Sequence, residues 1–352
     1  MMQALRDLQQ SQGATLTNES FPTSFGQDAD AFKAVSTGAV VVDRSHWGLL
    51  ELKGRDRLRF LHNQTTNTFT ERQPGEGCDT VFVTSTARTI DLATVYVTDD
   101  ALLILTSPGQ DQRLMDWMDR YIFPADQVSL SNLTGSMAVF SLIGPGSTAC
   151  LETLGISLEA EMPYAHHRTV NIGSLSMRLA VGSGLTLAGY TLLVPADAAA
   201  PVWQHLINAG GIPAGEDLWQ QLRVQQGRPA PACELTDDYN PLEAGLWQAI
   251  SFDKGCYIGQ ETIARLNTYK GVKQKLWGIQ LSALVEAGTP ITANGDTIGM
   301  LTSSIPMDPG ALGLGYIRTK AGGAGLEVTV GEVRGIVIEV PFLSHDYPVA
   351  QR

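Results

Sequence analysis

Apolar positions follow two different spacings along this chain. An apolar side chain at every second position predicts a strand, and a spacing of three and four predicts an amphipathic helix. Strands are therefore expected at 80–85, 93–99 and 101–107, and helices at 55–67 and 110–123. Within the second helix Leu114, Met118 and Tyr121 share one face, and Pro124 ends it. This order of elements resembles a split βαβ unit.

The spacing changes twice further along the chain. From Met137 to Arg228, strands are expected at 137–144, 174–181 and 190–195, and a helix at 216–226 ends at Gly227. From Lys273 onward, short alternating segments with Gly-rich turns replace helices, and Asn294-Gly295 is a strong two-residue hairpin signal. These segments predict a small β-barrel or sandwich at the C-terminal end.

The pattern divides the chain into four regions. Residues 1–30 show no sustained period and are expected to form a flexible arm, or one helix and a loop. Mixed α/β regions follow at 31–135 and 136–270, and these two can be interleaved. Residues 271–352 form the C-terminal barrel, so the expected fold class is α+β.

Composition and charge narrow the class of protein. The chain has 352 residues, 43% of them hydrophobic and 17% charged, which is typical of a globular protein of two or three domains. Its 24 Lys and Arg against 36 Asp and Glu give a net charge of −12, which disfavours direct binding of nucleic acid. We find no apolar run of membrane-spanning length, no secretory signal and no CxxC pair, so the expected location is the cytoplasm.

The segment 254–261, KGCYIGQE, contains the strongest candidate chemistry. A thiol becomes reactive when a nearby cation stabilises the thiolate, and Lys254 can provide that charge for Cys256. Gly255 and Gly259 permit positive φ or a close backbone approach, as in a tight loop around a ligand. The alternative is a buried packing cysteine in a Gly-flanked turn. No metal site is expected, because one cysteine cannot fill a tetrahedral site and the pair at 166–167 is more typical of a solvated loop.

This segment resembles the K-G-C-[FY]-x-G-Q-E signature of the YgfZ family, within the GcvT aminomethyltransferase superfamily. The segments 43–67, 120–128 and 222–247 support the resemblance, which therefore spans nearly the whole chain after the first 30 residues. It implies a three-domain ring around a central folate-binding channel. It also implies Cys256 and Lys254 as catalytic candidates. The remaining motif positions are Gly255, Tyr257, Gly259, Gln260 and Glu261.

The resemblance also suggests folate-binding residues. Asp91 is the only acid on its strand, where the aminomethyltransferases carry a pair, and a solvated edge acid is the alternative. Arg223 matches a recurrent family arginine and is an anion anchor or a surface ion pair. Tyr190 and Trp247 are candidate stacking surfaces or core residues. Thr191 stands where family members often have a pterin-binding Glu, which argues against tight, transferase-like folate binding.

The resemblance implies a folate-binding accessory factor for the biogenesis or repair of iron–sulfur proteins, with indirect support of tRNA modification. Its cofactor would be tetrahydrofolate or a one-carbon derivative, and its partners would be iron–sulfur client or assembly proteins, with no nucleic acid and no membrane. The family has no settled reaction; an enzymatic reaction would be tetrahydrofolate-dependent one-carbon transfer. The alternatives are a glycine-cleavage aminomethyltransferase or related demethylase, and a scaffold without folate.

Overall fold

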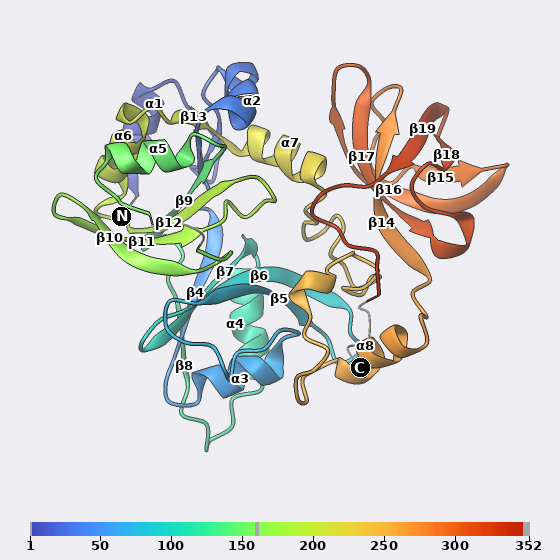
Figure 1. The fold of residues 1–352 in the computed structure, drawn as a ribbon, viewed down its shortest axis with the longest axis horizontal. Coiled ribbons are helices and arrows are strands. Elements are labelled where there is room, and N and C mark those ends of the chain that lie inside the picture. The colour runs from blue at the N-terminus through green and yellow to red at the C-terminus, as the bar shows by residue number, and fades with distance from the viewer. Residues whose placement is uncertain (1, 159–161, 348–352) are drawn as a thin grey trace. The chain divides into compact units, whose positions relative to one another are not determined.

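The structure is a computed structural model that describes residues 2–158 and 162–347 (Figure 1). The chain forms two compact units, and each unit is assembled from separate stretches of sequence. The first unit comprises Met1–Phe60, Phe69–Asp79 and Ala93–Gln220. The second comprises Leu61–Thr68, Thr80–Leu92 and Gln221–Arg352. The domain boundaries expected from the sequence stay predictions.

A six-stranded sheet with the order β10-β11-β12-β9-β3-β13 organises much of the first unit. Its ladders are antiparallel except the last, in which β13 runs parallel to β3. The strands are β3 (Val40–Asp43), β9 (Met137–Ile143), β10 (His167–Ile172), β11 (Leu175–Val181), β12 (Gly189–Pro195) and β13 (Ile212–Ala214). The associated helices are α1 (Gln3–Ser11), α2 (Asp28–Thr37), α5 (Ser147–Thr153) and α6 (Ala199–Asn208).

The N-terminal stretch contributes to this core. Helix α1 presents Leu5, which is 1% exposed, to an apolar cluster that also contains Phe140 and Trp203. Two short strands, β1 (Thr15–Leu16) and β2 (Pro22–Ser24), follow the helix. Of the two possibilities left open for residues 1–30, this part of the chain therefore shows the helix, with buried side chains.

A five-stranded sheet has the order β5-β6-β7-β4-β8. Its strands are β4 (Trp47–Lys53), β5 (Gly77–Val83), β6 (Thr89–Val97), β7 (Ala101–Pro108) and β8 (Ser129–Asn132). Its helices are α3 (Arg57–Gln64) and α4 (Asp111–Asp119). Both helices fall where the apolar spacing predicted them, and Leu114 and Met118 of α4 are buried as expected. The prediction that Pro124 ends this helix is wrong, because α4 ends at Asp119 and is followed by a turn at residues 120–121.

The C-terminal part of the second unit is a closed barrel with the strand order β14-β17-β16-β15-β18-β19. The strands are β14 (Gln274–Leu281), β15 (Pro290–Ala293), β16 (Asp296–Pro306), β17 (Ala311–Arg318), β18 (Glu327–Val330) and β19 (Val333–Ile338), with the 3₁₀ turn η2 (Thr319–Ala321). Asn294 and Gly295 both have positive φ, as a two-residue hairpin turn requires. The predicted α+β fold with a C-terminal barrel is confirmed.

A helical segment precedes the barrel in the chain. It contains α7 (Glu216–Gln226), the 3₁₀ turn η1 (Trp247–Ala249) and α8 (Gln260–Thr268). The KGCYIGQE residues occupy the loop before α8 and the first turn of that helix (Figure 1). This loop and residues 61–68 belong to the same compact unit, so their mutual geometry can be described directly.

Candidate functional site: the loop before helix α8

The loop before α8 holds the most accessible thiol of the chain. Cys256 is exposed and lies outside helix and strand, four residues before the first residue of α8. The loop ends at Gly259, which has a φ of +81° and precedes the helix. A Cβ at this position would lie 2.8 Å from the main-chain oxygen of Thr84, so only glycine fits without strain. The alternative of a buried packing cysteine is therefore excluded.

Gly255 does not share the backbone conformation of Gly259. Its φ is not positive, and a Cβ added to it would meet no atom within 4 Å. The positive φ that both glycines permit is therefore observed at Gly259 and not at Gly255. Sequence spacing could not distinguish the two, because the constraint at Gly259 comes from the main chain of a distant segment.

Residues 61–68 are hydrogen-bonded to the chain on both sides of the loop. The N–H of Ser251 donates to the carbonyl of Thr66 at 3.0 Å, and the N–H of Ile258 donates to the carbonyl of Asn63 at 3.1 Å. The hydroxyl of Thr66 donates to the carbonyl of Ala249 at 2.7 Å. The chain on both sides of Cys256 is thus hydrogen-bonded to a single short segment.

Lys254 contributes further contacts to the same segment. Its Nζ donates to the carbonyl oxygens of His62, Thr65 and Asn67 at 2.5, 2.7 and 2.6 Å. Its Nζ also lies 4.7 Å from the ring centroid of Tyr257. The sequence predicted that this charge lies beside the thiol, whereas in the structure the ammonium group donates to main-chain oxygens.

The other polar side chains of the motif are those of Tyr257, Gln260 and Glu261. Burial raises the pKa of Tyr257 to about 12, so its phenol stays protonated at physiological pH. Gln260 and Glu261 open α8, and the exposed Glu261 carboxylate interacts favourably with the positive end of the helix dipole. Gln260 Nε2 lies 3.5 Å from the carbonyl of Lys254, at the limit of a hydrogen bond.

Trp247 belongs to an apolar cluster next to the motif. We call this group the tryptophan cluster; its buried members are Ala87, Leu242, Trp247, Ile250, Ile263 and Val272, and Phe252, Tyr257, Leu266 and Tyr347 pack against it. The indole of Trp247 is 7% exposed, stacks on Phe252 and meets Tyr347 edge-on. Of the two roles considered for Trp247, its surroundings match core packing.

The remaining cysteines are less accessible than Cys256. The neighbouring Gly75, Gly77 and Asp79 predict an exposed turn at Cys78, and this prediction is wrong, because Cys78 lies on β5 and is 8% exposed. Cys150 is buried, as its place on a short helix beside Leu151 predicts. Its thiol donates to the carbonyl of Leu206 at 3.7 Å, and burial raises its pKa. Cys233 is half-buried.

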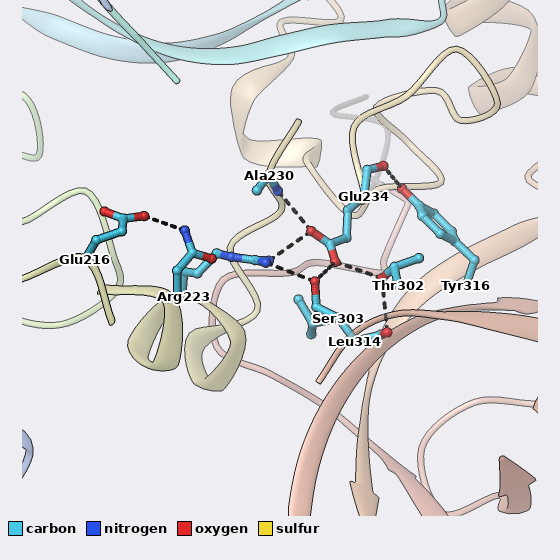
Figure 2. A network of polar contacts seen from close by, with 9 residues as sticks. Glu216, Arg223, Ala230, Glu234, Thr302, Ser303, Leu314 and Tyr316 are labelled. Atoms are coloured by element: carbon cyan, nitrogen blue, oxygen red, sulfur yellow. Dashed lines mark hydrogen bonds and ion pairs between the residues drawn. The ribbon is translucent and has the colours of Figure 1, made fainter. Parts of the chain in front are cut away.

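Arg223 participates in a buried polar network (Figure 2). Its Nη1 pairs with Glu234 Oε2 at 3.0 Å, and its Nη2 donates to Ser303 Oγ at 2.9 Å. Glu234 is fully buried and also accepts hydrogen bonds from the hydroxyls of Thr302 and Ser303 and from the N–H of Ala230. The Arg223 ion pair is therefore buried, and the surface ion pair considered from the sequence is not observed.

The network ties the segment after α7 to the barrel. Thr302 and Ser303 lie on β16, and the hydroxyl of Tyr316 on β17 donates to the carbonyl of Glu234 at 2.8 Å. Burial raises the pKa of Tyr316 well above its usual value. Sequence reasoning missed Glu234, because no spacing connects residue 234 with residues 302 and 316.

Asp91 and Tyr190 are placed on separate compact units. Asp91, on β6, is 0% exposed, which excludes the alternative of a solvated edge acid. Tyr190, on β12, is half-buried, and its hydroxyl shares a hydrogen bond of 3.0 Å with Thr148. Thr191 is buried; its Oγ1 donates to the carbonyl of Gly182 at 2.8 Å and lies 3.4 Å from Arg44 Nη2. The folate-binding roles of Asp91 and Tyr190 stay predictions.

The histidine pair differs from the solvated loop expected for it. His167 starts β10 and is 3% exposed, and its Nδ1 accepts a hydrogen bond from Arg178 at 2.8 Å. Burial, with the Arg178 charge, lowers the pKa of His167 to about 4. Across residues 2–158 and 162–347, no cluster of three metal-binding side chains occurs, and none of the helices is long and apolar enough to span a membrane.

Together, the two sheets and the closed six-stranded barrel define the class of GcvT-type folds. The structure of the glycine cleavage system aminomethyltransferase T from Bartonella henselae superimposes with a TM-score of 0.85 over 98% of both chains, at 18% identity. The sequence model described as the GCVT N-terminal domain matches residues 11–254, so the chain belongs to this family.

Two curated relatives extend the comparison. At1g60990, a chloroplastic protein of Arabidopsis thaliana whose name proposes a transferase activity, is 44% identical over 339 residues, covering 96% of this chain and 78% of the relative. An aminomethyltransferase of Halothermothrix orenii is 26% identical over 337 residues, covering 92% of this chain and 94% of the relative.

Proposed function

We propose that this protein is a folate-binding accessory factor of the YgfZ type for the biogenesis or repair of iron–sulfur proteins. The observation that carries the proposal is the exposed Cys256 in a loop anchored on both sides, within a chain of the GcvT superfamily. The aminomethyltransferase reaction needs no cysteine, so an accessible thiol in the signature segment favours a different activity. Support of tRNA modification would follow indirectly, through iron–sulfur enzymes that depend on the factor.

The ligand would be tetrahydrofolate or a one-carbon derivative. Asp91 is the candidate for the pterin edge, and its complete burial is consistent with a role away from bulk solvent. Tyr190, Arg223 and Trp247 stay candidates, although Arg223 already pairs with Glu234 and Trp247 packs in the tryptophan cluster. Thr191 stands where the resemblance places an acidic pterin ligand, which predicts weaker folate binding than in a transferase.

Two experiments test the proposal. In a strain that lacks the gene, wild-type protein should restore the activities of iron–sulfur enzymes, and Cys256→Ala should not. Cys233→Ala is the matched control, because this half-buried cysteine lies outside the motif and should leave rescue intact. Titration with tetrahydrofolate should show binding near micromolar concentration, and the absence of binding would leave the scaffold alternative.

A tetrahydrofolate-dependent aminomethyltransferase or related demethylase is the second candidate. It is favoured by the similarity to curated aminomethyltransferases over most of their length. Formation of methylene-tetrahydrofolate from an aminomethylated carrier protein would support this candidate and contradict the first. We propose the cytoplasm as the location, since the cysteines form no CxxC pair, although At1g60990 is described as chloroplastic.

A further inference from the structure

The main chain around the end of α3 forms an oxygen cage for a cation. The last carbonyls of a helix have no partner within the helix, and the negative end of the helix dipole lies there. In α3 (Arg57–Gln64) the carbonyl of Asn63 is satisfied by the N–H of Ile258, and that of His62 by Lys254. The carbonyls of Thr65 and Asn67, just beyond the helix, complete the cage.

The geometry assigns to Lys254 the role of a positioning residue: its ammonium fills this cage and holds the loop that carries Cys256. A lysine ammonium has three N–H donors, and three carbonyl oxygens receive them. The role deepens the proposed function, because it concerns the same loop. It differs from activation of the thiol by a nearby charge.

Neighbouring contacts make the cage a rigid support. The N–H of Thr66 donates to the carbonyl of Val81 at 3.2 Å, and the N–H of Asn67 donates to the hydroxyl of Thr80 at 3.0 Å. Residues 65–67 are thereby held to β5, and Lys254 transmits this fixed position to the loop. Tyr257, which lies under the ammonium and packs against the tryptophan cluster, provides a second anchor.

The three carbonyl oxygens of the cage fit an ammonium better than a guanidinium. Lysine presents a compact ammonium that can face converging carbonyls, whereas the planar guanidinium of arginine donates in a fixed fork. Lys254→Arg should therefore restore the charge without restoring the anchor. Lys254→Met keeps most of the stem and removes the ammonium, and Lys254→Ala leaves room for a small amine.

The test uses full-length protein with Cys233→Ser, so that Cys256 is the one accessible thiol among the four cysteines. Hydrogen exchange of residues 251–259 is measured by mass spectrometry, and the pH profile of Cys256 alkylation by iodoacetamide is measured in parallel. Lys273→Met is the matched control, because Lys273 is exposed, lies in the same unit and belongs to no ion pair within residues 2–158 and 162–347.

With Lys254→Met, exchange of the loop amides should accelerate by about tenfold or more, since each charge-assisted hydrogen bond is worth at least that factor. The alkylation midpoint should stay within about 0.3 pH unit of the parent, because the lost group is an anchor. Lys273→Met should change neither quantity. In Lys254→Ala, propylammonium, which replaces the missing atoms, should slow exchange again, whereas tetramethylammonium, which has no N–H donor, should not.

Other results would overturn the assignment. A midpoint raised by about one pH unit with unchanged loop exchange would show that Lys254 activates the thiol instead. Equal effects of the two amines, or full recovery with Lys254→Arg, would show that charge alone matters. If Lys254→Ala does not fold, Lys254→Met decides the question. Neither readout involves folate or iron–sulfur enzymes, so failure of the proposed function would leave this result standing.

Discussion

The two glycines of the KGCYIGQE segment should respond very differently to the same substitution. Gly259 has a φ of +81°, and a Cβ there would lie 2.8 Å from the carbonyl oxygen of Thr84 and 3.0 Å from Val83 Cγ2. Gly255 has neither a positive φ nor any atom within 4 Å of an added Cβ. Gly259→Ala and Gly255→Ala therefore form a matched pair within one loop.

The magnitudes follow from the two local geometries. An L-residue in the left-handed region costs about 1–2 kcal/mol, and forcing a methyl group against packed atoms costs about 1–3 kcal/mol. Gly259→Ala should therefore lower the free energy of unfolding by about 3 kcal/mol, equivalent to a loss of about 6–12 °C in Tm. Gly255→Ala should change it by less than about 1 kcal/mol, with stabilisation expected because alanine restricts the unfolded chain.

Urea unfolding followed by tryptophan fluorescence measures both variants under identical conditions. The second unit contains Trp247 and Trp277, so local unfolding near the loop contributes to the signal. Equal stability of the two variants, or a neutral Gly259→Ala, would refute the assignment of strain to Gly259. A large loss with Gly255→Ala would show that the open space around this glycine is filled in solution.

Three further predictions concern other groups. Arg223→Met should lower the free energy of unfolding, measured with a denaturant, by about 3–5 kcal/mol, because it leaves the Glu234 carboxylate buried without its cation. The double variant Arg223→Met/Glu234→Met should regain more than half of that loss. The pKa of His167 is lowered to about 4, so its neutral ring contributes its whole stabilisation above about pH 6.5. The free energy of unfolding should fall by at most about 3 kcal/mol between that pH and pH 4, and His167→Gln should remove this dependence on pH. At neutral pH, iodoacetamide should label Cys256 first and Cys150 last, as peptide mapping would show.

Local periodicity predicted the parts of the fold that depend on neighbouring residues. The apolar spacing located α3 and α4, and the Asn294-Gly295 pair located the β15–β16 hairpin. The predicted helix ends were less accurate, because residues 120–123 keep the apolar spacing but lie outside the helix. Such differences arise where hydrogen bonds to a side chain compete with the helix, as when the carboxylate of Asp126 accepts the N–H of Phe123.

The site could be predicted only in part. The signature located Cys256 and its exposure, because an eight-residue pattern with two glycines is local. The partners of Lys254 lie as far as 192 residues away in the chain, and Glu234 contacts Ser303 across 69 residues. No periodicity specifies such contacts, so the roles of these two charges emerged only from the structure.

The arrangement around Cys256 combines two properties that seldom occur together, an accessible thiol and a fixed position. Hydrogen bonds hold the loop at the Lys254 side chain before the thiol and at the Ile258 main chain after it, yet no burial protects the sulfur. A thiol in a closed pocket can meet only small molecules, whereas a fixed and exposed one can also meet another protein at little cost in conformational entropy. If this thiol serves a protein partner, Cys256→Ser should abolish rescue and leave tetrahydrofolate affinity unchanged. A parallel loss of folate affinity would instead place the thiol in the folate chemistry itself.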